Sequence, residues 1–458
     1  MNNIVTLFEY TLKKFREGDR DLYDEKNNEL ILRRKTIEEL KKLSEKKDDE
    51  EKIIELRWGE IRTLNYVGVI KVGDITIEIL PKFLKKGEES ELGDINKLKE
   101  KVTKNLLKML EYTQELRIRE IDYASLEKVE HDFFEIFIYL FAKNLISLLK
   151  VKQNYEYVRK WEELRFVKGR IDFARYTNPA KLHIIPCIHY ERSMDNLINR
   201  TLKYTCYLLS RMTNSPENYR LLRRILDILE GVTLTPVTIQ EIDRITFNRL
   251  NADFEPFIDI YRLILEGSTL TLQASRIETF SLMIPMENLF EEFVAEVILK
   301  ERLHEEIFGE NAKVIIPRRS MIRYYLAEKS YRDGTKKKLF KLIPDITIKV
   351  DDEFKLIIDT KYKLLKPESV KLGVSSQDAY QIYAYCKVLG AKKALLLYPD
   401  NLVNIDSKEL ETPIRLGKEG EIELFVGIVP LHYDLTNDEG FRDFVEKLGN
   451  ILETVAGG

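Results

Sequence analysis

The segment at 342–363, LIPDITIKVDDEFKLIIDTKYK, constrains the fold of this chain more than any other stretch. It contains two runs that alternate like β-strands, joined by a tight acidic turn at 351–353. With Asp352 as the pivot, one face of the two strands is wholly apolar. The predicted cross-strand pairs are Ile346 with Ile358, Ile348 with Leu356, Val350 with Phe354, Thr347 with Ile357, and Asp345 with Asp359. The segment therefore predicts a β-hairpin in which two aspartates face each other.

The two opposed aspartates, Asp345 and Asp359, are suited to a divalent cation. Directly opposed residues have Cβ atoms about 4.5 to 5.5 Å apart, so two carboxylates that would otherwise repel can share one Mg²⁺ ion. Lys361 lies two positions beyond Asp359, which puts its ammonium group on the same face, beside a reacting phosphate. This combination predicts metal-dependent hydrolysis of phosphodiesters. The alternative is a strand-entry aspartate and an exposed Asp–Lys edge pair.

Charge is distributed unevenly along the chain. The formal net charge of −3 gives no overall attraction to nucleic acid or to an anionic membrane. Between Lys313 and Lys341, however, ten lysines or arginines stand against two acids. A run of this kind is usually a solvated loop or hairpin. Its position just before the aspartates makes it the best candidate in the sequence for a DNA contact.

The length of 458 residues exceeds what one hydrophobic core normally supports. We expect a multidomain α+β protein with a β-rich N-terminal region at 1–96, which binds a partner, and a mainly helical middle region at 97–270. Residues 271–458 are expected to form an α/β domain with a mixed central sheet. Within the first region, Gly73-Asp74 predicts a hairpin turn, and the charged stretch at 36–60 predicts an exposed helix or a long loop.

Cysteine content and hydropathy restrict the compartment. Only three cysteines occur, widely spaced, which excludes a disulfide framework and a four-cysteine iron–sulfur cluster. The N-terminus lacks the pattern of a signal peptide, and no apolar stretch reaches membrane-spanning length. We expect a reduced, cytoplasmic protein without a membrane partner.

The aspartate hairpin resembles the PD-(D/E)xK nuclease superfamily. Pro344-Asp345 corresponds to the first motif and Asp359-Thr360-Lys361 to the second. The resemblance implies an acidic residue on the helix before the hairpin, and Glu291 is the best match, with Glu287 and Glu292 as alternatives. It also implies that Asp345, Asp359 and Glu291 bind Mg²⁺, with Mn²⁺ as a possible substitute.

The helix predicted after the hairpin carries a second family feature. Gln381 and Tyr385 form a Gln-x-x-x-Tyr pair like that of RecB-like nucleases, with Asp378 on the same face. The resemblance implies that Gln381 and Tyr385 position DNA. Ordinary packing of Tyr385 in the core is an equally good interpretation of the spacing.

A wider resemblance covers most of the chain. Its order of motifs is similar to that of McrC, the nuclease subunit of the McrBC modification-dependent restriction system. The stretches that carry the resemblance lie at 66–83, 164–173, 190–203 and 286–294, followed by the nuclease motifs. The resemblance implies a metal-dependent endonuclease that cuts methylcytosine-containing double-stranded DNA and stimulates the GTPase of its partner, a hexameric McrB-type AAA+ ring. Because this chain has no G-x-x-x-x-G-K-[ST] loop, GTP is expected to bind to the partner.

Some alternatives remain open at this level. In the family a projection enters the pore of the ring, and the candidates here are the stretches at 36–60 and 160–192. A stand-alone RecB-like exonuclease or repair nuclease would share the C-terminal motifs without needing a GTPase. A non-catalytic adaptor is disfavoured, because it would have no need to keep Asp345, Asp359 and Lys361 together.

Overall fold

The computed structural model of the chain contains two compact units. One unit combines residues 1–123 with 281–458, and the other comprises 124–280. The described residues are 3–45, 52–82, 95–113, 133–176, 181, 183–267, 279–320, 322–333, 335–363, 373–400 and 412–457. The expected mixture of α and β structure is confirmed. The three-part division stays a prediction, and its boundary at 270 lies outside the described residues.

The N-terminal part of the first unit begins with a five-stranded sheet and one helix. In spatial order the strands are β3 (Leu22–Asp24), β4 (Glu29–Leu32), β2 (Leu12–Glu17), β6 (Glu60–Thr63) and β5 (Ile54–Arg57), with α1 at Arg34–Glu45. The expectation of an exposed helix or loop at 36–60 is therefore wrong in part. Leu40, Leu43 and Ile54 are buried together, because β5 pairs with β6 and completes the core under α1.

A four-stranded sheet follows and contains the predicted Gly73-Asp74 hairpin. Its strands, in spatial order, are β1 (Asn3–Phe8), β8 (Ile75–Leu80), β7 (Tyr66–Val72) and β12 (Thr279–Pro285). β7 and β8 are antiparallel, and Gly73 has φ +54°, which a tight turn requires and glycine adopts without strain. Helix α2 (Ile95–Tyr112) belongs to the same unit.

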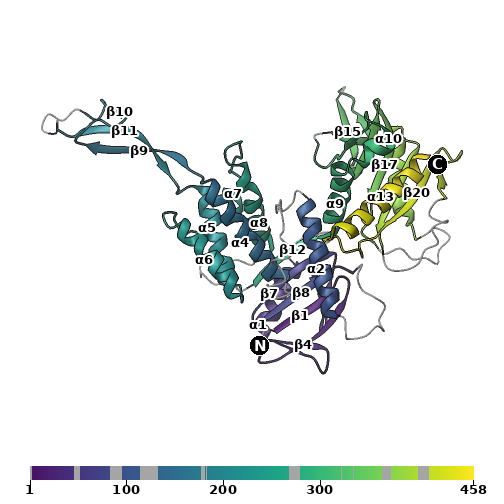
Figure 1. Cartoon of the computed structure of the whole chain (residues 1–458), viewed down its shortest axis with the longest axis horizontal. Coiled ribbons are helices and arrows are strands. Elements are labelled where there is room, and N and C mark those ends of the chain that lie inside the picture. The colour runs from purple at the N-terminus through teal and green to yellow at the C-terminus, as the bar shows by residue number, and fades with distance from the viewer. Residues whose placement is uncertain are drawn as a thin grey trace. The chain divides into compact units, whose positions relative to one another are not determined.

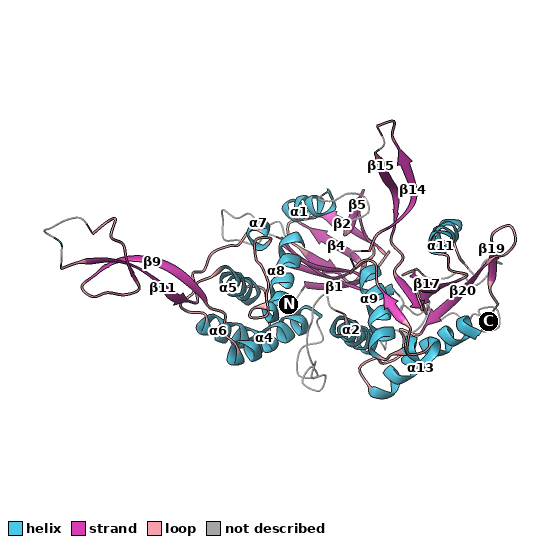
Figure 2. Ribbon diagram, turned by 90° about the horizontal axis from the view of Figure 1, so that it is seen from above, coloured by secondary structure: helices cyan, strands magenta, loops and turns pink. Residues whose placement is uncertain are grey.

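The C-terminal part of the first unit is built on a mixed six-stranded sheet. In spatial order its strands are β13 (Lys313–Ile315), β16 (Ile346–Val350), β17 (Glu353–Thr360), β18 (Lys393–Pro399), β20 (Ile422–Val429) and β19 (Ile414–Leu416). β18 runs parallel to both β17 and β20. The helices are α9 (Met286–Lys300), α10 (Leu303–Phe308), α11 (Ser376–Leu389) and α13 (Asp438–Gly457). Figure 2 shows α11 and α13 on opposite faces of this sheet.

The predicted aspartate hairpin is β16–β17. The pairs Ile346–Ile358 and Ile348–Leu356 occur as expected. The expected pair of Val350 with Phe354 is wrong, because a bulge after Ile348 shifts the register so that Val350 pairs with Glu353. Asp351 and Asp352 have φ of 48° and 69°, so together they form a two-residue turn with both residues left-handed, which aspartate tolerates.

A second hairpin, β14 (Tyr324–Ser330) with β15 (Lys336–Leu342), forms a two-stranded sheet of its own directly before β16. In Figure 2 it extends away from the six-stranded sheet. The basic run recognised in the sequence therefore includes a complete element of structure.

The second unit is a group of helices with one long strand pair (Figure 1). Its helices are α4 (Phe133–Val151), α5 (Leu197–Ser210), α6 (Pro216–Ile228), α7 (Ile239–Ile242), the short 3-10 helix η4 (Ala252–Phe254) and α8 (Glu255–Gly267). β9 (Glu156–Leu164) pairs antiparallel with β11 (Ile185–Ser193), and β11 also pairs with β10 (Arg170–Ile171). We call these three strands the arm. Within the described residues, no helix combines the length and apolar character needed to cross a membrane.

Candidate active site

Asp345 and Asp359 meet at one end of the β16–β17 hairpin. Asp345 directly precedes β16, and its Oδ2 accepts hydrogen bonds from the Thr360 backbone N (2.7 Å) and Oγ1 (2.8 Å). Asp359 is 1% exposed. Its Oδ2 lies 2.5 Å from Lys361 Nζ, a charge-assisted contact, whereas its Oδ1 has no hydrogen-bond partner among the described residues. An unsatisfied buried carboxylate is costly unless a cation neutralises it.

The electrostatics of the pair agree with this geometry. Burial, followed by the charge of Glu291, raises the pKa of Asp345 to about 7. Burial, followed by the charge of Asp345, raises the pKa of Asp359 to about 7. Two carboxyl groups that resist ionisation next to each other are a site where a divalent cation replaces protons.

Lys361 links the aspartates to helix α11. Its Nζ lies 3.1 Å from Gln381 Oε1, to which it donates a hydrogen bond. Burial disfavours the charged form, but the neighbouring carboxylates, Asp359 foremost, outweigh it and raise the pKa of Lys361 above its usual value. The side chain therefore stays an ammonium group near neutral pH. It can stabilise negative charge on a phosphate but is a poor proton acceptor.

Gln381 contacts this lysine directly, and Tyr385 contacts Gln381. Gln381 Nε2 donates to Tyr385 Oη (2.7 Å), and Tyr385 Oη donates to the Ile343 carbonyl (3.1 Å). Tyr385 is buried in the core under α11, whereas Gln381 lines the open cavity. The structure therefore brings both predicted residues to the site. Gln381 faces the cavity, and Tyr385 contacts Gln381 from the core.

Glu291 lies on helix α9 and is already paired with an arginine, so it would have to give up part of this contact to bind a metal ion. Its carboxylate accepts from Arg318 Nη1 at 2.9 Å. Burial raises its pKa, and Arg318 opposes that rise. Glu287 also lines the cavity, whereas Glu292 is absent from the lining and pairs with Arg319.

The side chains converge on an open cavity of about 460 Å³. It is lined by Glu287, Asn288, Glu291, Arg318, Ile343, Asp345, Thr360, Lys361, Tyr362, Lys363, Gln377, Asp378 and Gln381. Among the described residues, no three histidine, cysteine or carboxylate side chains lie close enough to hold a metal ion by themselves. Asp345 and Asp359 could supply two ligands, with water or substrate oxygens completing the usual shell of Mg²⁺. The three-carboxylate ligand set with Glu291 stays a prediction.

One buried contact at this site was not found from the sequence. Tyr362, between Lys361 and Lys363, is buried, and its Oη donates to Glu9 Oε2 at 2.7 Å. Lys82 Nζ donates to the Tyr362 carbonyl at 3.3 Å. Burial raises the pKa of Glu9 to about 7. The residues that follow the N-terminal strands β1 and β8 thus hold the backbone next to Lys361. The only signal for this contact in the sequence is the aromatic residue inside D-T-K-Y-K.

Of the two segments considered for partner contact, the one at 160–192 forms most of the arm. Residues along β9 are largely exposed, including Tyr157 and Trp161. Gly169 has φ +74° and lies against β11, where a Cβ would come within 2.5 Å of the Ile188 carbonyl. Only glycine fits there, which explains the glycine of LRFVKGRIDF.

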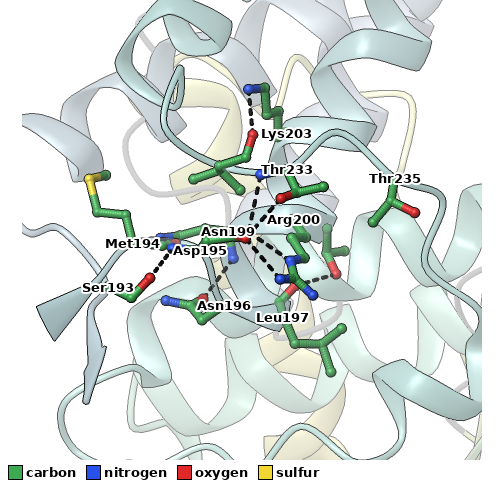
Figure 3. Close-up of polar contacts among 12 residues, drawn as sticks. Ser193, Met194, Asp195, Asn196, Leu197, Asn199, Arg200, Lys203, Thr233 and Thr235 are labelled. Carbon is green, nitrogen blue, oxygen red and sulfur yellow. Dashed lines mark hydrogen bonds and ion pairs between the residues drawn. The ribbon is translucent and has the colours of Figure 1, made fainter. Parts of the chain in front are cut away.

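The base of the arm is fixed by a polar network (Figure 3). Asp195 accepts from Arg200 Nε (2.7 Å) and Nη2 (2.9 Å), and also from Thr233 N (3.0 Å) and Oγ1 (2.8 Å). The Arg200 guanidinium is the main cause of the lowered pKa of Asp195. Asn196 caps α5, and Asn199 donates to the carbonyls of Asn154 and Met194. The two arm strands are therefore tied to the first turn of α5.

Comparisons with known proteins bear on both sequence and fold. The McrBC 5-methylcytosine restriction system component family matches residues 61–399, which is more than half of the chain. A search of curated proteins found no match.

Two solved structures share the fold. A refined half-complex from a tetradecameric assembly of Thermococcus gammatolerans McrB AAA+ hexamers with bound McrC matches with a TM-score of 0.67 and 21% identity, over 98% of this chain and 100% of that one. The cryo-EM structure of the Thermococcus gammatolerans McrBC complex matches with a TM-score of 0.51 and 23% identity, over 65% of this chain and 88% of that one. The resemblance to McrC inferred from the sequence motifs is confirmed, and the chain belongs to the McrBC 5-methylcytosine restriction system component family.

Proposed function

We propose that this chain is the metal-dependent DNA endonuclease subunit of a GTP-driven McrBC-type restriction complex. The observation that supports the proposal most directly is the cavity lined by Asp345 and Lys361, with the buried Asp359 paired to that lysine. Asp359 Oδ1 is buried without a hydrogen bond among the described residues, and both aspartates have raised pKa values. A hard cation such as Mg²⁺, or Mn²⁺ in its place, fits these carboxylates and would relieve their repulsion.

The chain's own residues have separable tasks in this proposal. Asp345 and Asp359 would hold the metal, which when bound lowers the pKa of a water molecule and neutralises charge on the phosphate. Lys361 remains an ammonium group and stabilises the additional negative charge of the transition state. Gln381 orients Lys361 by accepting its hydrogen bond, and Tyr385 in turn orients Gln381. Glu291 would assist the metal only after giving up part of its contact with Arg318.

The partner in this proposal is a hexameric McrB-type AAA+ GTPase, which binds the GTP. One of the similar solved structures contains McrB AAA+ hexamers with bound McrC, and the family name supports a 5-methylcytosine substrate. For the contact with the ring we favour the arm over the stretch at 36–60. In the latter, Leu40, Leu43 and Ile54 pack into a sheet core, whereas β9 exposes most of its side chains. Through this contact the chain would stimulate GTP hydrolysis.

Cleavage of methylated and unmethylated plasmid, with the chain alone and with the partner and GTP, tests the proposal. We expect cutting only with Mg²⁺, partner, GTP and methylation, and none by an Asp359→Asn variant. Robust cutting by the chain alone would instead identify a stand-alone RecB-like nuclease. Normal cutting by Asp359→Asn would contradict the assigned site itself.

A further inference from the structure

Two groups stand out among the basic residues between 313 and 341 in the folded chain. Arg318 and Arg319 turn inward to the carboxylates of α9, where Arg318 pairs with Glu291 and Arg319 with Glu296. The lysines of β14–β15 instead point into solvent. Arg318 therefore belongs to the candidate active site and Arg319 to the contacts of α9, and the lysines need a separate explanation.

Beyond its root, where Tyr324, Tyr325 and Leu342 are partly buried, the β14–β15 hairpin is exposed on both faces. From Leu326 to Ser330 every residue is exposed, and β15 is exposed apart from the partly buried Leu339 and Leu342. A two-stranded hairpin with no covered face is only marginally stable in water. A contribution to the stability of the fold does not account for such an element. We therefore expect it to contact a molecule outside the chain.

The root of this hairpin is attached to the active site. The Tyr324 ring packs edge-on against Phe354 of β17, with centroids 6.0 Å apart. The chain leaving β15 passes through Ile343, whose carbonyl accepts from Tyr385. Asp345 is only two residues further on. A ligand bound to the hairpin thus lies along the same backbone that carries the first aspartate.

The charge on the hairpin is unbalanced in a specific way. The cations of the hairpin and its turn are Lys329, Arg332, Lys336, Lys337, Lys338 and Lys341, against the acids Glu328 and Asp333. Lys336 pairs with Glu328, but Lys329 lies directly across from Lys337. Like charges directly opposed on two strands are destabilising. Neither Lys337 nor Lys341 forms an ion pair with a carboxylate among the described residues. A polyanion would remove this repulsion and release its own counterions on binding.

Apolar side chains stand exposed among these lysines. Phe340 is 68% exposed and Leu326 is 50% exposed. Phe340 also has φ +55°, a left-handed backbone conformation that is unfavourable for a bulky side chain. Exposed aromatic groups set among cations are the pattern with which proteins contact nucleic-acid bases and sugars as well as phosphates.

We propose that β14–β15 is the DNA-holding element of this nuclease, with its lysines on the backbone phosphates and Phe340 against sugars or bases beside the cut. This inference rests on the proposed nuclease function. It assigns the substrate contact to one hairpin and separates it from the arm, for which we propose the contact with the ring. DNA gripped by the hairpin would be led towards Asp345.

The test measures DNA affinity without cleavage. The full chain carrying Asp359→Asn is titrated onto a fluorescent duplex across a salt series, with and without Lys337→Ala, Lys338→Ala and Lys341→Ala combined. Each lost phosphate contact reduces the slope of log affinity against log salt by about 0.9. We expect the slope to fall by about 2 to 3 and the affinity by about tenfold or more. Phe340→Ala should weaken binding by about threefold to tenfold with little change in slope.

A matched triple variant serves as the control. Lys14, Lys418 and Lys447 are exposed lysines elsewhere in the same unit, and their replacement by alanine removes the same charge. An equal loss of DNA affinity in both triple variants would show that the effect comes from net charge alone, and it would overturn the assignment. Unchanged affinity in the hairpin triple, with an unchanged unfolding temperature, would also overturn it. So would a loss of complex assembly without a loss of DNA affinity, because the hairpin would then be a protein contact.

Failure of this inference can be distinguished from failure of the proposed function. If the partner-bound chain cuts DNA but the hairpin triple binds and cuts normally, the hairpin assignment is wrong and the nuclease stands. If the hairpin variants lose salt-dependent binding while no condition gives Mg²⁺-dependent cutting, the DNA contact stands and the catalytic assignment is wrong.

Discussion

Two hairpins follow each other along this chain, β14–β15 and β16–β17, and they solve opposite physical problems. The second is buried, with alternating branched side chains that pack into the core and two carboxylates at its end. Beyond its root, the first is exposed on both faces and carries lysines where the second carries isoleucines. Burial gives the second hairpin one register and makes every charge on it costly. Exposure leaves the first with little packing of its own and with charges that water solvates.

The two hairpins are suited to different tasks, one to the fixed placement of metal ligands and the other to contact with an extended ligand. Carboxylates that position a metal need a rigid support, which a buried strand pair supplies. A surface that grips a phosphate backbone needs positive charge and adaptable side chains more than a fixed geometry. Substitutions in the second hairpin should therefore have large and site-specific effects, whereas those in the first should have small effects on folding.

The largest expected effect is on catalysis. Asp359→Asn removes a carboxylate at the proposed metal site while keeping its size, and we expect the cleavage rate of the partner-bound chain to fall by about 1,000-fold or more. Asp352→Asn in the turn of the same hairpin is the control, because its side chain is 97% exposed and its ion pair with Lys349 is worth little. Equal rates for the two variants would remove Asp359 from the mechanism.

The next largest expected effect is on stability, where substitutions in the two hairpins should differ because only one of them is packed in the core. Ile358 is fully buried in β17, and its replacement by alanine should lower the free energy of unfolding by about 2 to 4 kcal/mol through lost burial and a residual cavity. Phe340→Ala removes a larger side chain from β15 but should change it by less than about 0.5 kcal/mol. Denaturant unfolding of the full chain measures both. A large loss for Phe340→Ala would mean that the first hairpin has a packing partner.

The pH dependence of stability should also come from the buried hairpin. Asp345 and Asp359 have pKa values raised from 3.8 to about 7, so between these limits the folded state keeps protons that the unfolded state has lost. Without metal, the free energy of unfolding should therefore fall as pH rises from about 4 to 7, by on the order of 1 to 3 kcal/mol, and level off above.

Mg²⁺ should counteract that fall, because it favours the ionised carboxylates. The combined Asp345→Asn and Asp359→Asn variant should flatten the profile and no longer respond to Mg²⁺. Denaturant titrations at several pH values, in EDTA and in Mg²⁺, provide the comparison. An equally steep fall in that variant would place its cause elsewhere, and Glu9, whose pKa is also raised to about 7, would be the next residue to test.

The smallest expected effect has the opposite sign. Replacing Lys337 by alanine removes its repulsion with Lys329 and should raise the free energy of unfolding by a few tenths of a kcal/mol at low salt, with the difference shrinking as salt rises. Lys355→Ala on the buried hairpin is the comparison, since Lys355 pairs with Glu353 and gains nothing from removal. A clear loss of stability on removing Lys337 would show that this lysine has a favourable contact in the free chain.

Local pattern was enough to predict much of the β16–β17 hairpin. Alternation identified β16 and β17 and their central register, and it placed Asp345 across from Asp359, consistent with the observed pairs. It failed at the turn, because a bulge and two left-handed aspartates shorten the connection. Side-chain alternation carries no signal for a bulge of this kind.

The sequence by itself determined the elements whose cause is local. Strand alternation, a glycine turn, a buried apolar helix and the D-x-K spacing all depend on residues close together in the chain. Only the tertiary structure decided which distant groups meet. Tyr362 reaches Glu9 across 353 positions, Arg318 occupies Glu291, and the first and last parts of the chain form one unit. These contacts depend on how buried faces pack and on which charges can be neutralised where water is excluded, and neither is written in any short stretch of residues.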